Sequence, residues 1–227
     1  RKPDLVWYHF SAHVVCYADE QAGPDWPGEV AGDIQKELGL RPSLLQGHLG
    51  DVNPGDGSDW RGEIRQTVAA VTPALKRAIA EAAPVTVDCL RARSAPFNVP
   101  FDMERFEQWI DEYRRDPSKC VSGPWVDAGF AADWYAGNEH RDRNAKSLPI
   151  TLGAIRLGPV GMLFHPGELY SFYGLAIRRD SPFENTLVIG CADGSIGYVP
   201  DPKAYEAGEY SAIVVPKIVD LPPYQPT

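Results

Sequence analysis

The stretch Gly161-Met-Leu-Phe-His-Pro-Gly-Glu168 decides the fold, because it predicts a buried strand that delivers an acidic side chain into a turn. Residues 161–164 form a short apolar run, Pro166 and Gly167 end it, and residues 169–177 then place apolar side chains at helical spacing. Glu168 is therefore predicted at a strand-to-helix junction. Open α/β sheets concentrate functional side chains at the carboxyl ends of strands, and a helix N-terminus favours an anionic group.

A second strand and loop follow downstream of this junction. Residues 186–190 predict a strand that runs into a glycine-rich loop, residues 191–200, and this loop presents Tyr198. The loops that carry Glu168 and Tyr198 are expected to meet at one site.

The N-terminal part of the chain begins with a predicted strand, residues 5–13, that ends near His13 and puts His9 on the same face. Asp25 is a natural N-cap for a helix that Gly39 closes, and Val30, Ile34 and Leu38 are predicted to form the buried face of this helix. The further predictions are a strand at 43–46, a glycine-rich loop at 47–57, a helix at 59–83 interrupted by Pro73, a strand at 85–90, helices at 103–113 and 125–135, a solvated charged stretch at 138–146, and a hairpin of strands 150–157 and 160–164.

This alternation of strand and helix signals is the α/β pattern, and we expect a mixed β-sheet core covered by helices. We assign residues 1–227 to a single α/β domain. Because the chain starts abruptly at a strand, we expect an upstream segment that is missing or lies on another chain.

Composition excludes several classes of function. The formal net charge is -9 and no basic run is present, which argues against a nucleic-acid partner. No apolar stretch approaches the ~20 residues of a transmembrane segment. The 4 cysteines lie far apart, so that buried free thiols are a better interpretation than a disulfide framework or a zinc ribbon.

Four short motifs, taken together and in order, resemble the neutral/alkaline non-lysosomal ceramidase family and its bacterial homologues. They are His9-Phe-Ser-Ala-His13 at a strand end, Gly50-Asp-Val-Asn-Pro54 in a glycine loop, Pro166-Gly-Glu168 before a helix, and Gly197-Tyr-Val199. The resemblance covers most of the chain and implies a fold like the N-terminal domain of neutral ceramidases.

The resemblance also implies a Zn²⁺ site. In that family two histidines, a glutamate and a tyrosine hold the ion, and the match carries three of these ligands onto His13, Glu168 and Tyr198. The other histidine belongs to the expected upstream segment, so we predict a heteromer in which a second polypeptide segment or subunit supplies it. Zinc accepts imidazole nitrogen and carboxylate oxygen, which is consistent with this ligand set.

The family hydrolyses the amide bond of N-acyl sphingoid bases. The resemblance therefore implies a zinc-dependent hydrolase of an amide (N-acyl) bond in a small-molecule or lipid substrate, with metal-activated water attacking the carbonyl. The alternatives are an esterase or lactonase on the same zinc site, and a non-catalytic subunit that kept the fold. A serine hydrolase lacks support, because no Gly-x-Ser-x-Gly motif is present.

Asn53, His48 and Tyr198 are the catalytic candidates. Family members usually carry serine where this chain has Asn53, whose amide could donate to a developing oxyanion or simply cap the loop before Pro54. His48 and His165 flank the same two loops and are expected to line the pocket, and His165 is a further candidate for the metal shell.

Each ligand has a plainer alternative role. His13 could be a hydrogen-bonded core histidine, Glu168 could favour a helix N-terminus, and Tyr198 could be a packing lid. Asp51 is expected to hold its own loop through backbone hydrogen bonds.

Overall fold

The structure is a computed structural model, and it describes residues 5–17, 22–59, 61–119 and 128–226. Residues 1–4, Cys120 and the first residues of the helix predicted at 125–135 lie outside the described residues.

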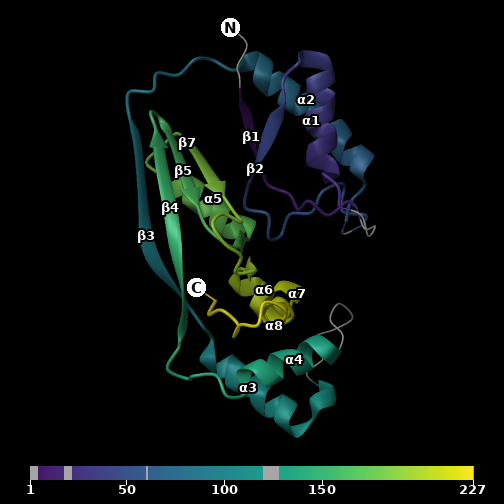
Figure 1. The fold of residues 1–227 in the computed structure, drawn as a ribbon, viewed down its shortest axis with the longest axis vertical. Helices are drawn as coiled ribbons and strands as arrows, with labels where there is room; N and C mark the ends of the chain where they lie inside the picture. The colour runs from purple at the N-terminus through teal and green to yellow at the C-terminus, as the bar shows by residue number, and fades with distance from the viewer. Residues whose placement is uncertain (1–4, 18–21, 60, 120–127, 227) are drawn as a thin grey trace.

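Strands and helices alternate along an elongated molecule (Figure 1). The strands are β1 (Val6–Phe10), β2 (Pro42–Gln46), β3 (Leu90–Pro100), β4 (Ser147–Leu157), β5 (Val160–Phe164), β6 (Glu168–Leu169), β7 (Asn185–Ile189) and β8 (Tyr198–Val199). The helices are α1 (Asp25–Leu38), α2 (Ile64–Glu81), α3 (Met103–Arg115), the 3₁₀ helix η1 (Pro117–Lys119), α4 (Ala128–Asn138), α5 (Ser171–Asp180), α6 (Pro202–Ala207), α7 (Tyr210–Ile213) and α8 (Val215–Ile218). No described helix combines the length and the apolar character needed to cross a bilayer.

The N-terminal unit is a parallel pair of strands, β1 and β2, connected by α1 and covered by α1 and α2. Trp26, Val30 and Ile34 of α1 are fully buried at 0% exposure in the core of this unit. Burial of each such side chain contributes about 1.5–3 kcal/mol. The predicted helical face of α1 is therefore confirmed.

The larger sheet has the strand order β3-β4-β5-β7. Its first three strands pair antiparallel, whereas β5 and β7 are parallel and α5 lies between them in the chain. The hairpin predicted at Gly158 and Pro159 joins β4 to β5, and Gly158 adopts a left-handed φ of 55°. The prediction of an α/β fold with a mixed sheet covered by helices is confirmed.

Two predicted boundaries in the N-terminal unit, the end of β1 and the N-cap of α1, are wrong. β1 ends at Phe10, where the Phe10 carbonyl accepts from Gly47 N at 2.8 Å, so His9 and His13 do not share a strand. Pro24 takes the N-cap position of α1, because Asp25 has a φ of 49° and its carboxylate accepts from the adjacent Trp26 N–H.

α2 also differs from its prediction. It begins at Ile64, because the Glu63 carboxylate accepts from the backbone N–H groups of Arg65 and Gln66. Pro73 lies inside the helix without dividing it. The buried side chains Val71 and Leu75 flank Pro73 and pack into the α1 core, and this packing compensates for the lost hydrogen bond.

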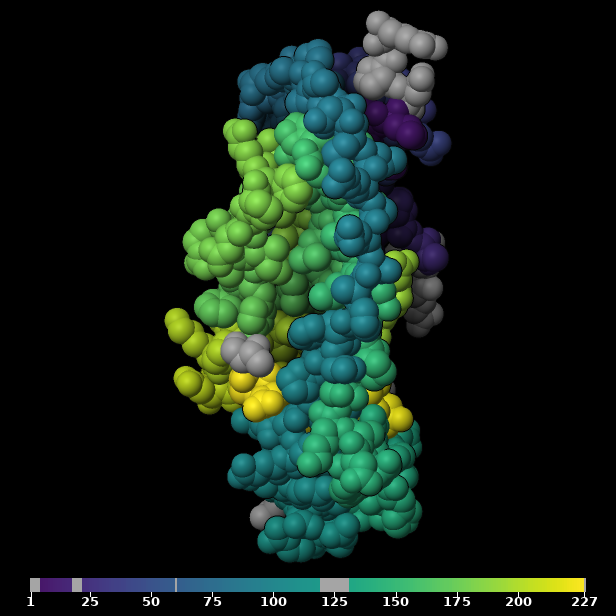
Figure 2. Space-filling model, turned by 90° about the vertical axis from the view of Figure 1, so that its left-hand side faces the viewer, coloured from purple at the N-terminus to yellow at the C-terminus, as the bar shows by residue number. Residues whose placement is uncertain are grey.

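The strand predicted at 85–90 lies instead at β3, whose residues pair with β4 from Leu90↔Leu157 to Pro100↔Ser147. Most β3 side chains are exposed, as an edge strand allows, and the strand forms a long ridge on the face shown in Figure 2. The strand therefore lacks the apolar alternation on which the prediction relied.

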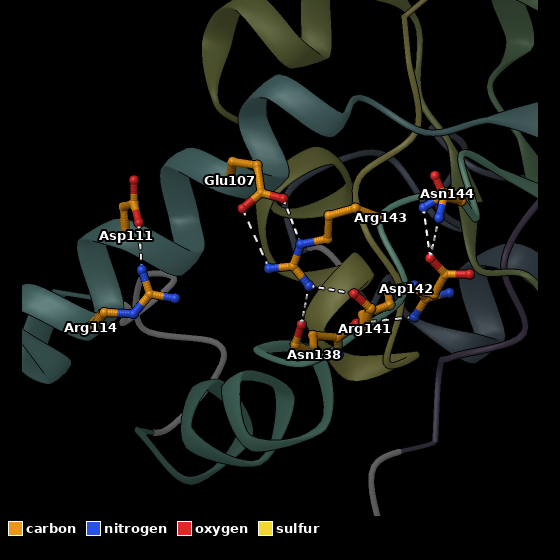
Figure 3. Close-up of polar contacts among 8 residues, drawn as sticks. All are labelled: Glu107, Asp111, Arg114, Asn138, Arg141, Asp142, Arg143 and Asn144. Carbon is orange, nitrogen blue, oxygen red and sulfur yellow. Dashed lines mark hydrogen bonds and ion pairs between the residues drawn. The ribbon is translucent and has the colours of Figure 1, made fainter.

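The far end of the molecule holds α3 and α4, with Phe106, Ile110 and Trp134 buried between them. The stretch predicted as solvated, 138–146, is partly structural (Figure 3). Arg143 pairs with Glu107 at 2.7 Å, and fully buried Asn138 donates to the Asp220 carboxylate at 2.6 Å.

Candidate metal centre

Glu168 and Tyr198 face the same site because β6 and β8 pair in parallel, with Glu168 opposite Tyr198 in the register. Glu168 N donates to the Gly197 carbonyl at 2.9 Å. Gly197 has a φ of 72°, and a Cβ there would lie 2.9 Å from a methyl group of Val215, so only glycine suits this entry into β8.

His13 reaches the site from beyond the end of β1. Its backbone N–H donates to the Val52 carbonyl at 2.9 Å, and its carbonyl accepts from the Trp26 indole at 2.9 Å. Gly50 N donates to the Leu169 carbonyl at 2.9 Å, which fastens the same glycine loop to β6. One loop thus holds His13 through Val52 and reaches β6 through Gly50, which brings the N-terminal unit to the β6–β8 pair.

The three predicted ligands converge. The Tyr198 hydroxyl lies 3.0 Å from His13 Nε2, and Glu168 Oε2 lies 3.8 Å from His13 Nδ1. The Tyr198 hydroxyl also hydrogen-bonds the Glu168 carboxylate. Only 11% of the His13 side chain and 24% of the Glu168 side chain are exposed to solvent. We call these three residues the His13 triad.

Burial controls protonation in the His13 triad. It lowers the pKa of His13, although a backbone hydrogen bond to Gly50 opposes it. It raises the pKa of Glu168, against the hydrogen bond from Tyr198, and it raises the pKa of Tyr198, reinforced by the Glu168 charge. The imidazole is therefore favoured as the neutral ligand form, and the His13–Glu168 contact is not a strong ion pair.

The donor set of the triad fits a zinc ion. Imidazole nitrogen and carboxylate oxygen are zinc ligands, and a nearby dication would favour the ionised forms of Glu168 and Tyr198 that burial disfavours. The 3.0 Å between the Tyr198 hydroxyl and His13 Nε2 is close to the roughly 3.3 Å that separates two ligands of a tetrahedral zinc ion, whereas the Glu168 carboxylate lies nearest to the other ring nitrogen, Nδ1, at 3.8 Å. Among the described residues, no group of three or more His, Cys, Asp or Glu side chains is arranged to hold a metal. The triad is not such a group, because it contains only one histidine and one carboxylate and its third donor is a tyrosine.

Asp51 lies at the edge of the site and does not simply hold its own loop, as its sequence context predicts. Its carboxylate accepts from the backbone N–H of Ser171 at 2.6 Å and from the Ser171 hydroxyl at 2.5 Å. Asp51 thus supplies the anionic group at the N-terminus of α5. The sequence assigns that role to Glu168 as an alternative, but the Glu168 side chain contacts His13 and Tyr198.

The catalytic candidates outside the triad are placed differently. Asn53 is exposed and follows Val52, the residue that anchors His13, but no hydrogen bond of its side chain is found among the described residues. His48 is buried beneath α5, where a Cβ on Gly174 would lie 2.2 Å from its ring, and its Nδ1 lies 3.5 Å from the Ser11 hydroxyl. The structure therefore places Asn53 on the loop whose Val52 carbonyl accepts from His13, and it buries His48 beneath α5.

His165 lies near His48 rather than in the triad. Its Nδ1 accepts from Gly167 N–H at 3.3 Å, and burial together with the nearby His48 lowers its pKa to about 4. His9, at a ring distance of 6.4 Å from His48, donates to the Val188 carbonyl at 2.9 Å. These three histidines were not predicted as a cluster, because only the junction of the two sheets brings them together.

Tyr210 is a neighbour of the triad that the sequence analysis missed. Its ring lies 6.4 Å from the Tyr198 ring in a T-shaped arrangement, and burial, with the Glu168 charge, raises its pKa. Tyr210 begins the four-residue helix α7, which is too short to leave a periodic signal in the sequence.

The mixed α/β architecture of the chain is similar to the fold of ceramidases. A crystal structure of neutral ceramidase from Pseudomonas aeruginosa matches with a TM-score of 0.59 at 14% identity, over 97% of this chain and 45% of that chain. A ceramidase complexed with C2 matches with a TM-score of 0.58 at 15% identity, over 97% and 46%.

The chain spans less than half the length of these two structures. No protein-family model matches the sequence. No curated protein matches it either. The predicted ceramidase-like fold is confirmed by the structural similarity.

Proposed function

We propose that the His13 triad is part of the metal site of a zinc-dependent hydrolase that acts on an amide bond of an N-acyl substrate. The observation that carries the proposal is the convergence of His13 and Tyr198, which are 185 residues apart in the chain, on the Glu168 carboxylate. Their donor atoms fit zinc, and a structure described as a neutral ceramidase shares the fold. Three protein ligands are enough for a catalytic zinc site that keeps a position open.

The residues of the chain have separate roles in this proposal. His13, as a neutral imidazole, and the carboxylate of Glu168 would hold the ion together with Tyr198. Zinc, when bound, polarises the scissile carbonyl and lowers the pKa of water. Asn53 follows Val52 on the loop that anchors His13 and is exposed, and in this proposal its amide would donate to the oxyanion.

The proposed activity, hydrolysis of an N-acyl amide, rests on the zinc site and on the fold. Metal analysis distinguishes such an enzyme from a non-catalytic subunit with the same fold. Purified protein should contain stoichiometric zinc by elemental analysis. It should hydrolyse at least one member of a panel of N-acyl amides, and a chelator should abolish turnover that added zinc restores. Matched esters in the same panel test the esterase alternative. Zinc-free protein that hydrolyses nothing after zinc addition would contradict the proposal.

A further inference from the structure

The outer edge of β3 has no partner along most of its length. Among the described residues β3 pairs only with β4, and all residues from Leu90 to Asn98 are exposed. The edge is covered only from Pro100 onward, where the Pro100 carbonyl accepts from Gln225 N at 2.9 Å. Residues 90–98 therefore leave one side of the backbone ladder open, on the ridge that faces the viewer in Figure 2.

The direction of the free backbone groups follows from the residues at the end of β3. The Pro100 carbonyl bonds on the outer side, to Gln225, whereas the Phe101 N–H donates on the β4 side, to the Lys146 carbonyl. Successive residues of a strand direct their backbone groups to alternate sides. In the open part of the edge, the even-numbered residues therefore point outward. These are Leu90, Ala92, Ser94 and Asn98, each with an N–H and a C=O group, and Pro96 with a C=O group alone.

This edge lacks the usual protection against a further strand. Sheet edges are normally blunted by short strands, bulges, prolines or inward-pointing charges. β3 is 11 residues long and pairs with β4 without a bulge, from Leu90↔Leu157 to Pro100↔Ser147. Pro96 removes a single donor from the outer edge and leaves its carbonyl available. The edge can therefore accept the backbone of another extended segment.

The sequence of β3 complements itself in one antiparallel register. If Ser94 lies opposite Ser94 of a second copy, two-fold symmetry places each Arg91 opposite a Phe97, which is 49% exposed. Within one copy Arg91 faces Arg156 across the β3–β4 pair, and Arg156 lies over the Phe183 ring at 5.9 Å. Phe97 of the second copy would give Arg91 the equivalent cation–π contact.

Neighbouring registers fit less well. The register centred on Ser94 forms about eight backbone hydrogen bonds between the outward groups. A shift of the centre by one residue toward Leu90 places Arg93 opposite itself, and a shift by two places it opposite Arg91. Like charges directly opposite each other are destabilising. A shift of one residue the other way puts Leu90 opposite Pro100, which has no N–H and whose carbonyl is already bonded.

We propose that β3 is a dimerisation strand, along which two copies of this chain pair antiparallel with Ser94 at the two-fold axis. The two β3-β4-β5-β7 sheets then become one continuous sheet. The inference goes beyond the proposed function, because the contact needs neither a metal nor hydrolysis. A single strand pair is smaller than a standard protein interface, so we expect a reversible dimer with a Kd of roughly 10–100 µM.

Sedimentation equilibrium tests the dimer in solution. The mass of wild-type protein should rise from 25.0 kDa toward twice that value as the concentration increases from about 1 to about 500 µM. Ser94→Pro removes the central N–H at an outward position that tolerates proline, as Pro96 does, and should raise Kd at least about 10-fold. Ser94→Ala keeps the N–H and should dimerise as wild type does, as should Trp7→Lys on β1.

Cysteine cross-linking tests the register. Ser94→Cys should give a covalent dimer on oxidation, because the Cα atoms of two residues opposite each other in a hydrogen-bonded pair lie about 5.5 Å apart. Ala92→Cys should give no more covalent dimer than wild type with its native cysteines, because its two Cα atoms would lie roughly 14 Å apart.

Amide exchange in wild-type protein keeps the test independent of how the variants fold. The N–H groups of Ala92 and Ser94 should exchange about 3-fold or more slowly at about 500 µM than at high dilution. A wild-type monomer at about 500 µM, an unchanged Kd in Ser94→Pro, or loss of the dimer in Trp7→Lys would overturn the proposal. Cross-linking of Ala92→Cys in place of Ser94→Cys would overturn it as well.

Discussion

Asp51 binds the first residue of α5 across 120 residues of sequence, through hydrogen bonds of 2.6 Å to Ser171 N and 2.5 Å to the Ser171 hydroxyl. The carboxylate neutralises free donors and the positive end of the helix dipole at the N-terminus of α5. The same loop carries Gly50, Val52 and Asn53, so this contact also fixes the loop beside the candidate metal centre.

We predict that Asp51→Ala lowers the free energy of unfolding by about 1 kcal/mol, the usual loss for a helix cap, because both contacts with Ser171 disappear. Urea denaturation measures the change. Asp51→Asn, which keeps an acceptor oxygen for Ser171 N, should lose less. Equal stability of Asp51→Ala and wild type would show that solvent replaces the cap at no cost.

The zinc ligands are tested by substitution in the triad. Glu168→Gln and His13→Ala should each lose bound zinc and hydrolytic activity while the fold stays intact, because each removes a donor from a set of only three. Elemental analysis and circular dichroism are the measurements. His140→Ala, whose side chain is 90% exposed, serves as the control and should keep both. Full zinc and wild-type turnover in both triad variants would show that the metal assignment is wrong.

Substitution of Asn53 distinguishes its two predicted roles, donation to the oxyanion and capping of the loop before Pro54. If its amide stabilises the oxyanion, Asn53→Ala should lower kcat by ~100-fold or more with zinc retained, and no acyl-enzyme should accumulate, since an amide cannot serve as the nucleophile. Rapid-quench mass spectrometry checks for an acyl adduct. Because the side chain is exposed and unbonded among the described residues, stability should change little. A loss of stability with unchanged kcat would assign Asn53 to loop capping.

His165 should make the protein sensitive to acid. Its pKa is about 4 in the folded state and 6.5 ordinarily, so the unfolded chain takes up the proton first and stability is lost as pH falls from about 6.5 to about 4. This group alone should account for roughly 2 kcal/mol between pH 7 and pH 5. His165→Gln should flatten the pH dependence of urea unfolding by that amount.

Other groups set the rest of that pH profile. The pKa values of His9, His13 and His48 are lowered as well, mainly by burial, and act in the same direction. Glu168, whose pKa is raised, acts in the opposite direction. The difference in pH dependence of the free energy of unfolding between wild type and His165→Gln gives the contribution of His165. The same pH dependence in both proteins would contradict the burial of His165 as a neutral group.

We also predict that a second polypeptide segment pairs with β1. Among the described residues β1 pairs only with β2, and Trp7 in this edge strand and Leu5 just before it are 59% and 73% exposed. Unpaired edges with exposed apolar side chains are sites of strand addition. Native mass spectrometry should show a mass above 25.0 kDa, and Trp7→Lys should reduce it. An active, monodisperse 25.0 kDa monomer would exclude this partner.

Local patterns in the sequence were sufficient for much of the fold. The apolar spacing of Val30 and Ile34 predicted α1, and Gly158 with Pro159 predicted the β4–β5 hairpin, because these elements depend on side chains a few residues apart. The short motifs around His13, Glu168 and Tyr198 likewise singled out three residues whose side chains lie together in the structure. Predictions failed where partners are remote: β3 is an exposed edge strand defined by its pairing with β4.

The tertiary structure alone decided how these residues meet. The pairing of β6 with β8 puts Glu168 beside Tyr198, and the hydrogen bonds of the Gly50 loop bring His13 to them. The capping of α5 by Asp51 rather than by Glu168 follows from the same packing. Sequence patterns report the character of each segment, whereas contacts between distant segments arise only when the whole core forms, because burial and backbone pairing are satisfied jointly.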